Sequence, residues 1–442
     1  MDKQGSSLFA VKCFIGLWIA SLLTLLILPI TSKFHNMLET TIVIMFFVLA
    51  VSFVAILWYQ NTPCIYIKYH KIKAMSYKKL SFIISFSIIF SILGVVIVFL
   101  DRIYVRGIDY SLGLRAARYQ WLKAGNVGSI YGKIGNLMIP FSYCALFIGI
   151  FHWENIKKKQ RFFSLLAGFG VQTFFAMLNG GRSNILMAIV FAFTTCVMRK
   201  SQRKKIFPRI KGLPIFIGIV AIILFKYVAS IFYSFTDNNI EYLAITANNL
   251  GAELNNWYNQ NSNHFINTGI QIALYILHGI YYTGAVLINP RIATLNSNMS
   301  LRGILVILSR FHLINYQMEV PAFDGGGNNF IALPGILVYD YGYLGFIVST
   351  LLLGILTGSV LKCLNQKSHN MGIIKVVFCL TVLIHLYMSM VDMALGFGYF
   401  LFIVFAMVMM EFIAGFRYGF SGWTKVEDGK GIVMEDKNGN AY

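Results

Sequence analysis

Leu80–Leu100 reads LSFIISFSIIFSILGVVIVFL, a run of 21 residues that contains no charged side chain. As an α-helix this run is about 31 Å long, which matches the ~30 Å hydrocarbon core of a bilayer. Similar runs recur along the chain: 57% of its 442 residues are hydrophobic, only 12% are charged, and the mean hydropathy is +0.68. Soluble domains carry about 25% charged residues. The sequence therefore predicts an integral membrane protein.

The predicted fold class is all-α, a polytopic membrane protein with 10–12 transmembrane helices, because the apolar runs have helix length and lack the alternation of barrel strands. The strongest runs are Val11–Ile30, Thr40–Trp58, Leu80–Leu100, Ile134–Phe151, Phe162–Leu178, Asn184–Met198, Leu213–Phe232, Tyr343–Leu361, Ile373–Val391 and Gly396–Gly415. Two weaker runs, Thr268–Ile288 and Leu301–Met318, bring the count to 12 if both cross. The count is 10 if both are re-entrant or interfacial, and we favour 12. One membrane domain, residues 1–418, would precede a short cytoplasmic tail, residues 419–442.

The positive side chains predict the orientation. Three connections between runs hold 16 of the 37 lysines and arginines: Lys68, Lys71, Lys73, Lys78 and Lys79, then Lys157, Lys158, Lys159 and Arg161, then Arg199, Lys200, Arg203, Lys204, Lys205, Arg209 and Lys211. By the positive-inside rule these connections and both termini are cytoplasmic. The net charge of +20 is then a topology signal, and we expect no nucleic-acid partner. None of the six cysteines falls in an outward loop, so no disulfide is expected.

Two large outward loops follow from this topology, residues 101–133 and residues 233–267, the latter resumed at 319–341. The first loop opens with DRIYVRG, residues 101–107, and continues with Arg115 and Arg118. Arginines on the outward face oppose the usual charge bias. Arg102, Arg106, Arg115 and Arg118 carry forked, permanently charged donors that match phosphate oxygens. The loop therefore predicts an anionic ligand at the outer leaflet, and the alternative is an interfacial helix that meets membrane lipid phosphates.

Two shorter motifs face the same side. Gly180 and Gly181 precede Arg182 in a tight turn between two spans, where backbone amides and an arginine form a plausible anion site. The alternative is a plain helical hairpin with a snorkelling arginine.

The second motif lies just before a late span. Asp340 lies between Tyr339 and Tyr341, and such a carboxylate at a membrane edge is a candidate base, with tyrosines that stack on sugars. The alternative is an aromatic belt with a capping aspartate. Arg310, inside a compromised span, suggests a polar cavity.

These three motifs, in this order and on this side of the membrane, resemble the bacterial O-antigen (oligosaccharide repeat-unit) polymerases of the Wzy type. The resemblance covers roughly residues 80–361. It implies a GT-C-like glycosyltransferase of the inner membrane, with its active site at the periplasmic face. Donor and acceptor would both be oligosaccharides on undecaprenyl pyrophosphate, and the resemblance also implies a chain-length regulator protein as a partner.

The resemblance assigns roles to residues of this sequence. Arg106 and Arg182, with Asp340 as the base, would be catalytic. Substrate would be bound by Arg102, Arg115, Arg118, Arg310, Tyr339 and Tyr341. No cofactor and no metal are expected, because the sequence has no zinc-ligand spacing and no cluster of outward acids.

Other functions remain open. An O-antigen ligase shares this architecture, and a lipid-linked oligosaccharide flippase would be a transporter rather than an enzyme. The chain has no Walker A loop, which argues against ATP-driven transport. It also lacks the paired halves of many secondary transporters.

Overall fold

The computed structural model describes residues 8–33, 36–62, 76–111, 113–123, 129–179, 183–202, 204–205, 243–244, 247–248, 252–261, 264–288, 292–310, 312–317, 331–365, 372–391 and 399–418. The first half contains α1 (Phe9–Ile27), β1 (Ile30–Ser32), α2 (Met37–Asn61), α3 (Tyr77–Leu100), the π-helix η1 (Asp101–Val105), α4 (Leu114–Lys123), α5 (Ile130–Met138), α6 (Phe141–Phe151), the 3₁₀-helix η2 (Trp153–Asn155), α7 (Lys158–Asn179) and α8 (Ser183–Ser201). The second half contains β2 (Ala252–Leu254), α11 (Asn256–Asn261), α12 (His264–Ile288), α13 (Arg302–Arg310), α14 (Leu333–Asn365), α15 (Ile373–Met388) and α16 (Tyr399–Tyr418).

The chain is a multi-pass α-helical membrane protein. Eight helical segments within the described residues are long and apolar enough to cross a bilayer, and α15, with 16 residues, is slightly shorter. The weaker predicted run Thr268–Ile288 lies within α12, which has 25 residues and is about 37 Å long. The helix α13, in contrast, has nine residues, or about 14 Å, and does not cover ~30 Å of hydrocarbon. Leu301–Met318 is therefore not one membrane-crossing helix, and the predicted run 213–232 lies outside the described residues.

The reason that Leu301–Met318 is not a span lies at the end of α13. His312 has a φ of 58°, in the left-handed region. Its backbone N–H donates to the carbonyl of Ser309 at 2.9 Å, and the N–H of Leu313 donates to that of Leu308 at 3.0 Å. This pair of bonds is the Schellman arrangement, which stops a helix. The sequence prediction placed Arg310 inside a compromised span, whereas Arg310 is the last residue of α13.

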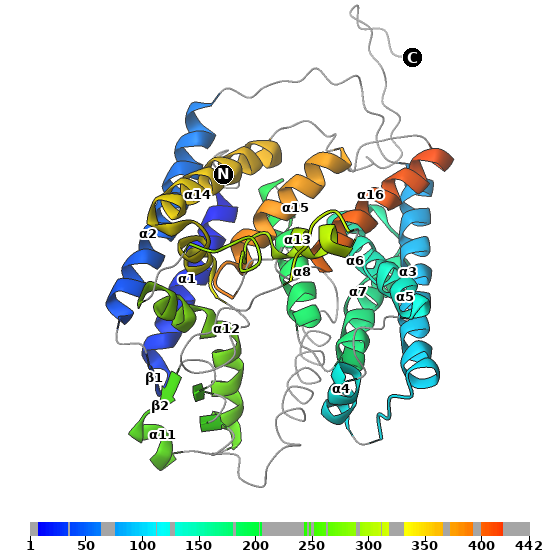
Figure 1. Ribbon diagram of the computed structural model, residues 1–442. Coiled ribbons are helices and arrows are strands. Elements are labelled where there is room, and N and C mark those ends of the chain that lie inside the picture. The colour runs from blue at the N-terminus through cyan, green and yellow to red at the C-terminus, as the bar shows by residue number, and fades with distance from the viewer. Residues whose placement is uncertain are drawn as a thin grey trace, which may run out of the picture.

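The helices have two distinct ends (Figure 1). We call one the loop end, where β1, β2, α11 and α4 lie, and the other the lysine end, where α3 and α7 begin and α16 finishes. At the loop end β1 pairs antiparallel with β2, with Thr31 opposite Glu253. Part of the predicted outward loop 233–267 therefore lies beside the connection between the first two spans.

The helix α14 is broken at Gly342, whose φ of 66° and ψ of −178° are not helical. The short segment before the break, Leu333–Asp340, is buried throughout. Its first N–H, on Leu333, donates to the carbonyl of Ser389 at 2.7 Å, just after α15 ends. Residues 333–341 are thus a helix packed inside the bundle, where the sequence prediction placed the end of an outward loop, because their apolar side chains gain more from burial than a loop would.

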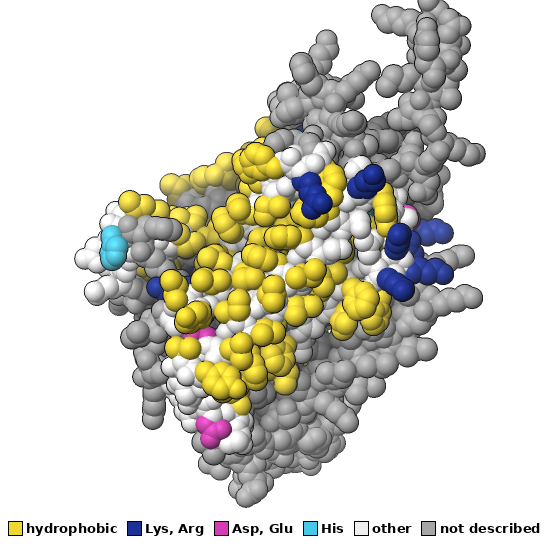
Figure 2. Space-filling model, turned by 90° about the vertical axis from the view of Figure 1, so that its right-hand side faces the viewer, with side chains coloured by type: hydrophobic (Ala, Val, Ile, Leu, Met, Phe, Trp, Pro, Cys, Tyr) yellow, Lys and Arg dark blue, Asp and Glu magenta, His cyan; other side chains and the backbone are white. Residues whose placement is uncertain are grey.

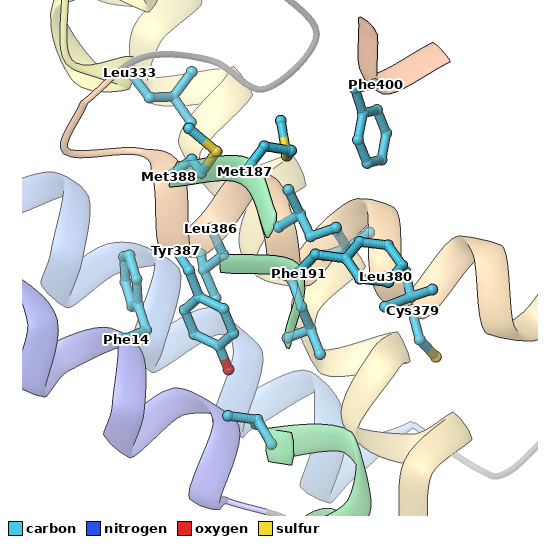
Figure 3. Close-up of a cluster of buried hydrophobic side chains, with 14 of the residues drawn as sticks. Phe14, Met187, Phe191, Leu333, Cys379, Leu380, Leu386, Tyr387, Met388 and Phe400 are labelled. Carbon is cyan, nitrogen blue, oxygen red and sulfur yellow. The ribbon is translucent and has the colours of Figure 1, made fainter. Parts of the chain in front are cut away.

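Interior packing brings together helices from both halves of the chain. Figure 3 shows Phe14 of α1, Phe191 of α8, Tyr387 of α15 and Phe400 of α16 in one buried cluster. Elsewhere α14 lies against α2 through two glycines four residues apart. A Cβ on Gly354 would meet Val54 at 2.7 Å, and one on Gly358 would meet the Ala55 carbonyl at 2.7 Å. Small residues at this spacing let membrane helices approach closely.

The outer surface is apolar across the middle of the bundle. Figure 2 shows hydrophobic side chains covering the face that lies on the right of Figure 1, with lysines and arginines gathered at one edge. Large apolar side chains point outward from several helices, among them Leu49 (61% exposed), Phe53 (63%) and Ile89 (61%). A continuous exposed apolar belt is costly in water and favourable in lipid, as expected for a membrane protein.

Candidate functional site

The arginine loop starts inside the protein rather than on its surface. At the end of α3 the helix widens into η1, and both Asp101 and Arg102 are buried, at 3% and 4% exposure. The N–H of Arg106 donates to the Asp101 carbonyl and that of Ile108 to the Arg102 carbonyl, each at 3.0 Å. Gly107 between them has a φ of 62°, which glycine adopts without strain. The motif Asp101–Gly107 is therefore a helix end that turns two charged side chains inward.

Arg102 joins three elements. Its Nη1 donates to the Leu178 carbonyl at 2.5 Å and its Nη2 to the side-chain oxygen of Asn179, both at the end of α7. Its guanidinium also lies 4.7 Å from the ring centre of Trp121 on α4. The last carbonyls of a helix lack partners within the helix and carry a partial negative charge. Arg102 supplies the missing donors, and it holds α4 against the same helix end.

Asp101 organises the other side of this cluster. Its Oδ2 accepts from Nε of Arg106 at 3.0 Å, and its Oδ1 accepts from the hydroxyl of Ser129, which precedes α5. A Cβ on Gly132 would lie 2.7 Å from Asp101 Oδ2, so this approach of α5 requires glycine. Arg106 is thus fixed in direction, but 15% of its side chain remains exposed at the loop end.

The remaining arginines of the prediction divide into two groups. Arg118 is exposed on α4. The side chains of Arg115 and Arg310, and the whole of Arg182, lie outside the described residues. Asn179, which Arg102 holds, is nevertheless the last described residue before the Gly180–Arg182 turn. The arginine loop therefore contacts the helix end that directly precedes the second motif.

The loop between η1 and α4 carries two titratable groups near the cluster. Burial raises the pKa of Tyr110, against the opposing effect of the nearby Arg102, and the Tyr110 hydroxyl donates to the Leu178 carbonyl at 3.1 Å. Asp109 is exposed, and its pKa is lowered by hydrogen bonds from Ser111, whose N–H donates at 2.8 Å. Asp109 is therefore an ionised carboxylate on the same loop as Arg106.

Asp340 has a different environment from the one we expected. Its Oδ1 accepts from the N–H of Met299 at 3.0 Å and its Oδ2 from that of Ser300 at 2.6 Å. Its side chain is buried, with 2% exposure for the residue. With both oxygens occupied by backbone donors, the carboxylate holds the segment before α13 in place. This arrangement disagrees with the prediction of a general base that reaches substrate.

The flanking tyrosines support the same segment. The Tyr341 hydroxyl lies 2.6 Å from the Ser300 hydroxyl, and the Tyr339 carbonyl accepts from the N–H of Ala293 at 3.1 Å. Tyr341 is 37% exposed, whereas Tyr339 is buried, at 9%. Of the two, only Tyr341 has a face available to a ligand.

The third motif is not part of the arginine cluster. Around it α14 packs on α2, α12, α15 and α8, whereas α4 and α5 pack on α7 and α3. Figure 1 shows α4 and α14 at opposite sides of the bundle. The structure thus joins the arginine loop to the end of α7 and keeps the Asp340 segment apart from both.

Sequence reasoning missed several residues of the cluster: Tyr110, Trp121, Ser129 and Asn179. The signal for Asn179 was present, because it stands directly before the two glycines at a helix end. Nothing local marks Trp121 or Ser129 as partners of residues 19 and 28 positions away in the chain.

Two negative findings complete the description. Among the residues that the structure describes, no group of three or more His, Cys, Asp or Glu side chains is placed to hold a metal ion. Comparisons with protein-family models, with curated proteins and with solved structures each find no match.

Proposed function

We propose that this chain polymerises oligosaccharide repeat units carried on undecaprenyl pyrophosphate, as an O-antigen polymerase of the Wzy type does, at the periplasmic face of the bacterial inner membrane. One observation carries the proposal: the arginine loop and the helix end leading into the Gly180–Arg182 turn are joined through Arg102. The arginine loop is one of the three motifs on which the resemblance rests, and the helix end leads directly into a second. Arg106, 15% exposed, and Arg118, exposed on α4, lie near this helix end and supply cations for a lipid-linked pyrophosphate.

The proposed reaction is a glycosyl transfer between two lipid-linked substrates. The hydroxyl of the acceptor sugar attacks the anomeric carbon of the donor glycan. The bond from that carbon to the pyrophosphate oxygen breaks, and undecaprenyl pyrophosphate leaves with the bonding electrons. Arg106, Arg118 and Arg182 stabilise the charge that develops on the leaving group, as preorganised donors do in other transferases.

The proton of the acceptor hydroxyl needs a base. Asp101 is occupied by Arg106 and Ser129, and Asp340 is occupied by two backbone amides. Asp109 is exposed on the arginine loop itself, so we assign the proton to Asp109 in this proposal. Arg102 and Asp340 then act as positioning residues.

A flippase for the same lipid-linked oligosaccharide is the second candidate. The observation in its favour is the break in α14, because discontinuous helices inside a bundle are common in transporters. An O-antigen ligase would use the same arginines on the same donor, with lipid A-core as the acceptor.

The lipopolysaccharide of cells that lack the gene distinguishes these functions on a silver-stained gel. Loss of the ladder with survival of the core-plus-one-unit band supports the polymerase, since export and ligation continue. Loss of every O-antigen band refutes it and indicates the ligase or the flippase.

Variants test the residues in the same strain. Arg106→Ala and Arg182→Ala should each remove or shorten the ladder. Lys33→Ala is the matched control, a cation at the same end of the bundle but beside β1. If both arginine variants leave the ladder unchanged, the role of the arginines is wrong.

A further inference from the structure

Five cations lie together at the lysine end: Lys78, Lys157, Lys158, Lys159 and Arg161. We call them the lysine patch. The four lysines are exposed and Arg161 is half-buried. Figure 2 shows lysines and arginines gathered at one edge of the apolar face, as expected for side chains at a membrane interface. The patch is therefore positioned at the level of lipid headgroups.

Contacts between α3 and α7 fix the patch in place. The Gln160 amide donates to the Ser81 hydroxyl at 2.6 Å, and the Tyr77 hydroxyl donates to Gln160 Oε1 at 3.5 Å. The Lys157 ammonium lies 5.7 Å from the centre of the Tyr77 ring. Lys78, on α3, is thereby held near the lysines that open α7.

Arg161 is also fixed in direction. Its Nε donates to the Ile156 carbonyl at 3.0 Å, and its guanidinium lies 5.2 Å from the centre of the Trp153 ring. A guanidinium held in this way loses little conformational entropy when it binds an anion.

Within the part of the chain that the structure describes, acidic side chains do not neutralise the patch. Glu154 is the carboxylate closest to it in the chain, and its two oxygens lie 2.5 and 3.2 Å from the guanidinium nitrogens of Arg199. No member of the patch forms an ion pair with another described residue. With respect to the described residues, all five positive charges are therefore available to an anion.

The surface next to the patch is apolar. Phe162, Phe163 and Leu166 follow on α7 and are 55%, 50% and 46% exposed. Cations directly above exposed aromatic and aliphatic side chains match a molecule with an anionic head and hydrocarbon tails.

We propose that the lysine patch binds an anionic phospholipid. The phosphate group lies among Lys78, Lys158, Lys159 and Arg161, and the acyl chains run along Phe162, Phe163 and Leu166. This lipid differs from the substrate at the loop end, because the patch lies at the other end of the bundle. The site therefore stands whether or not the proposed function is correct.

The test uses the purified full-length protein and native mass spectrometry in an equimolar mixture of phosphatidylglycerol and phosphatidylcholine. Each lysine near an anionic surface contributes about 1 kcal/mol, so Lys158→Gln/Lys159→Gln should weaken phosphatidylglycerol binding roughly 30-fold. The matched control is Lys33→Gln/Lys133→Gln, which removes the same charge at the loop end. This control variant should prefer phosphatidylglycerol over phosphatidylcholine as strongly as the wild type does.

Three outcomes overturn the proposal. Equal binding of the two lipids by the wild type refutes selectivity for an anionic lipid. An equal loss in both double variants shows a net-charge effect and not a site. A third arm adds inorganic phosphate alone: if phosphate stabilises the wild type against heat as much as phosphatidylglycerol does, the ligand is a free phosphate.

Discussion

Replacing Arg102 by lysine separates two roles that an arginine at this position could have. If Arg102 contributes charge to substrate binding, lysine keeps that charge and the effect is small. If its planar fork joins α7 to α4, lysine fails, because one ammonium cannot reach the Leu178 carbonyl and the Asn179 side chain while stacking on Trp121. The structure favours the second role.

The magnitude follows from these contacts. A hydrogen bond from a charged group contributes about 1.5–3 kcal/mol, and a desolvated cation–π contact about 2 kcal/mol. Arg102→Lys retains one hydrogen bond and loses the other hydrogen bond and the cation–π contact, so the local loss is about 4 kcal/mol. Local opening of α4 and of the end of α7 should then be roughly 1,000-fold more frequent.

Hydrogen–deuterium exchange of the purified protein measures this directly. Peptides covering α4 and the last turn of α7 should exchange faster in Arg102→Lys, while peptides of α2 stay as in the wild type. The O-antigen ladder should be lost in Arg102→Lys as completely as in Arg102→Ala. Lys33→Arg, beside β1 at the same end of the bundle, is the control and should keep both the wild-type exchange and the normal ladder. Wild-type exchange and a normal ladder in Arg102→Lys would refute the positioning role.

Three further predictions concern stability. Lys79→Met should lower the free energy of unfolding by about 3–5 kcal/mol, because it removes the ammonium that lies 2.7 Å from the buried Glu411 carboxylate, whereas Lys79→Met/Glu411→Leu should be near neutral. Chemical denaturation in detergent compares the two variants, and an equal loss of stability in both would contradict this. Gly279→Ala should lower the free energy of unfolding by about 1–3 kcal/mol, because a Cβ there lies 2.8 Å from two backbone carbonyl oxygens, whereas a Cβ on Gly16 meets nothing within 4 Å. The same melting temperature for Gly279→Ala and the control Gly16→Ala would disprove the close packing. Asp340→Asn should lower the free energy of unfolding by about 1–3 kcal/mol, because an amide has one oxygen and the carboxylate accepts from two backbone N–H groups. Hydrogen–deuterium exchange should become faster only in residues 292–301, and unchanged exchange there would show that Asp340 does not hold this segment.

The sequence predicted those features that depend on neighbouring residues. The membrane class and the end of α3 follow from an uncharged run that stops at Asp101. The helix end before Gly180 follows from paired glycines. In each case hydrophobicity or backbone freedom acts locally, so a window of a few residues contains the information.

The features that the sequence did not predict depend on distant contacts. Whether Arg102 faces phosphate or caps α7 is decided by residues more than seventy positions away. Asp340 has the composition of a membrane-edge base, but Met299 and Ser300 occupy its oxygens. The sequence does not predict the backbone break at Gly342 either, because a glycine in an apolar run is compatible with a straight helix and also with a positive φ.

The pairing of β1 with β2 has a consequence for biosynthesis. Thr31 and Glu253 are 222 residues apart, so the first strand emerges from the ribosome long before its partner. Until then its backbone groups have only water or the translocation machinery as partners, and the sheet closes once both segments reach the same side of the membrane. A chain that inserts one span too few leaves the two strands on opposite sides. The short sheet can thus form only in chains whose two strand segments lie on the same side of the membrane. Misinserted chains should leave the edges of both strands unpaired and exposed to quality-control proteases.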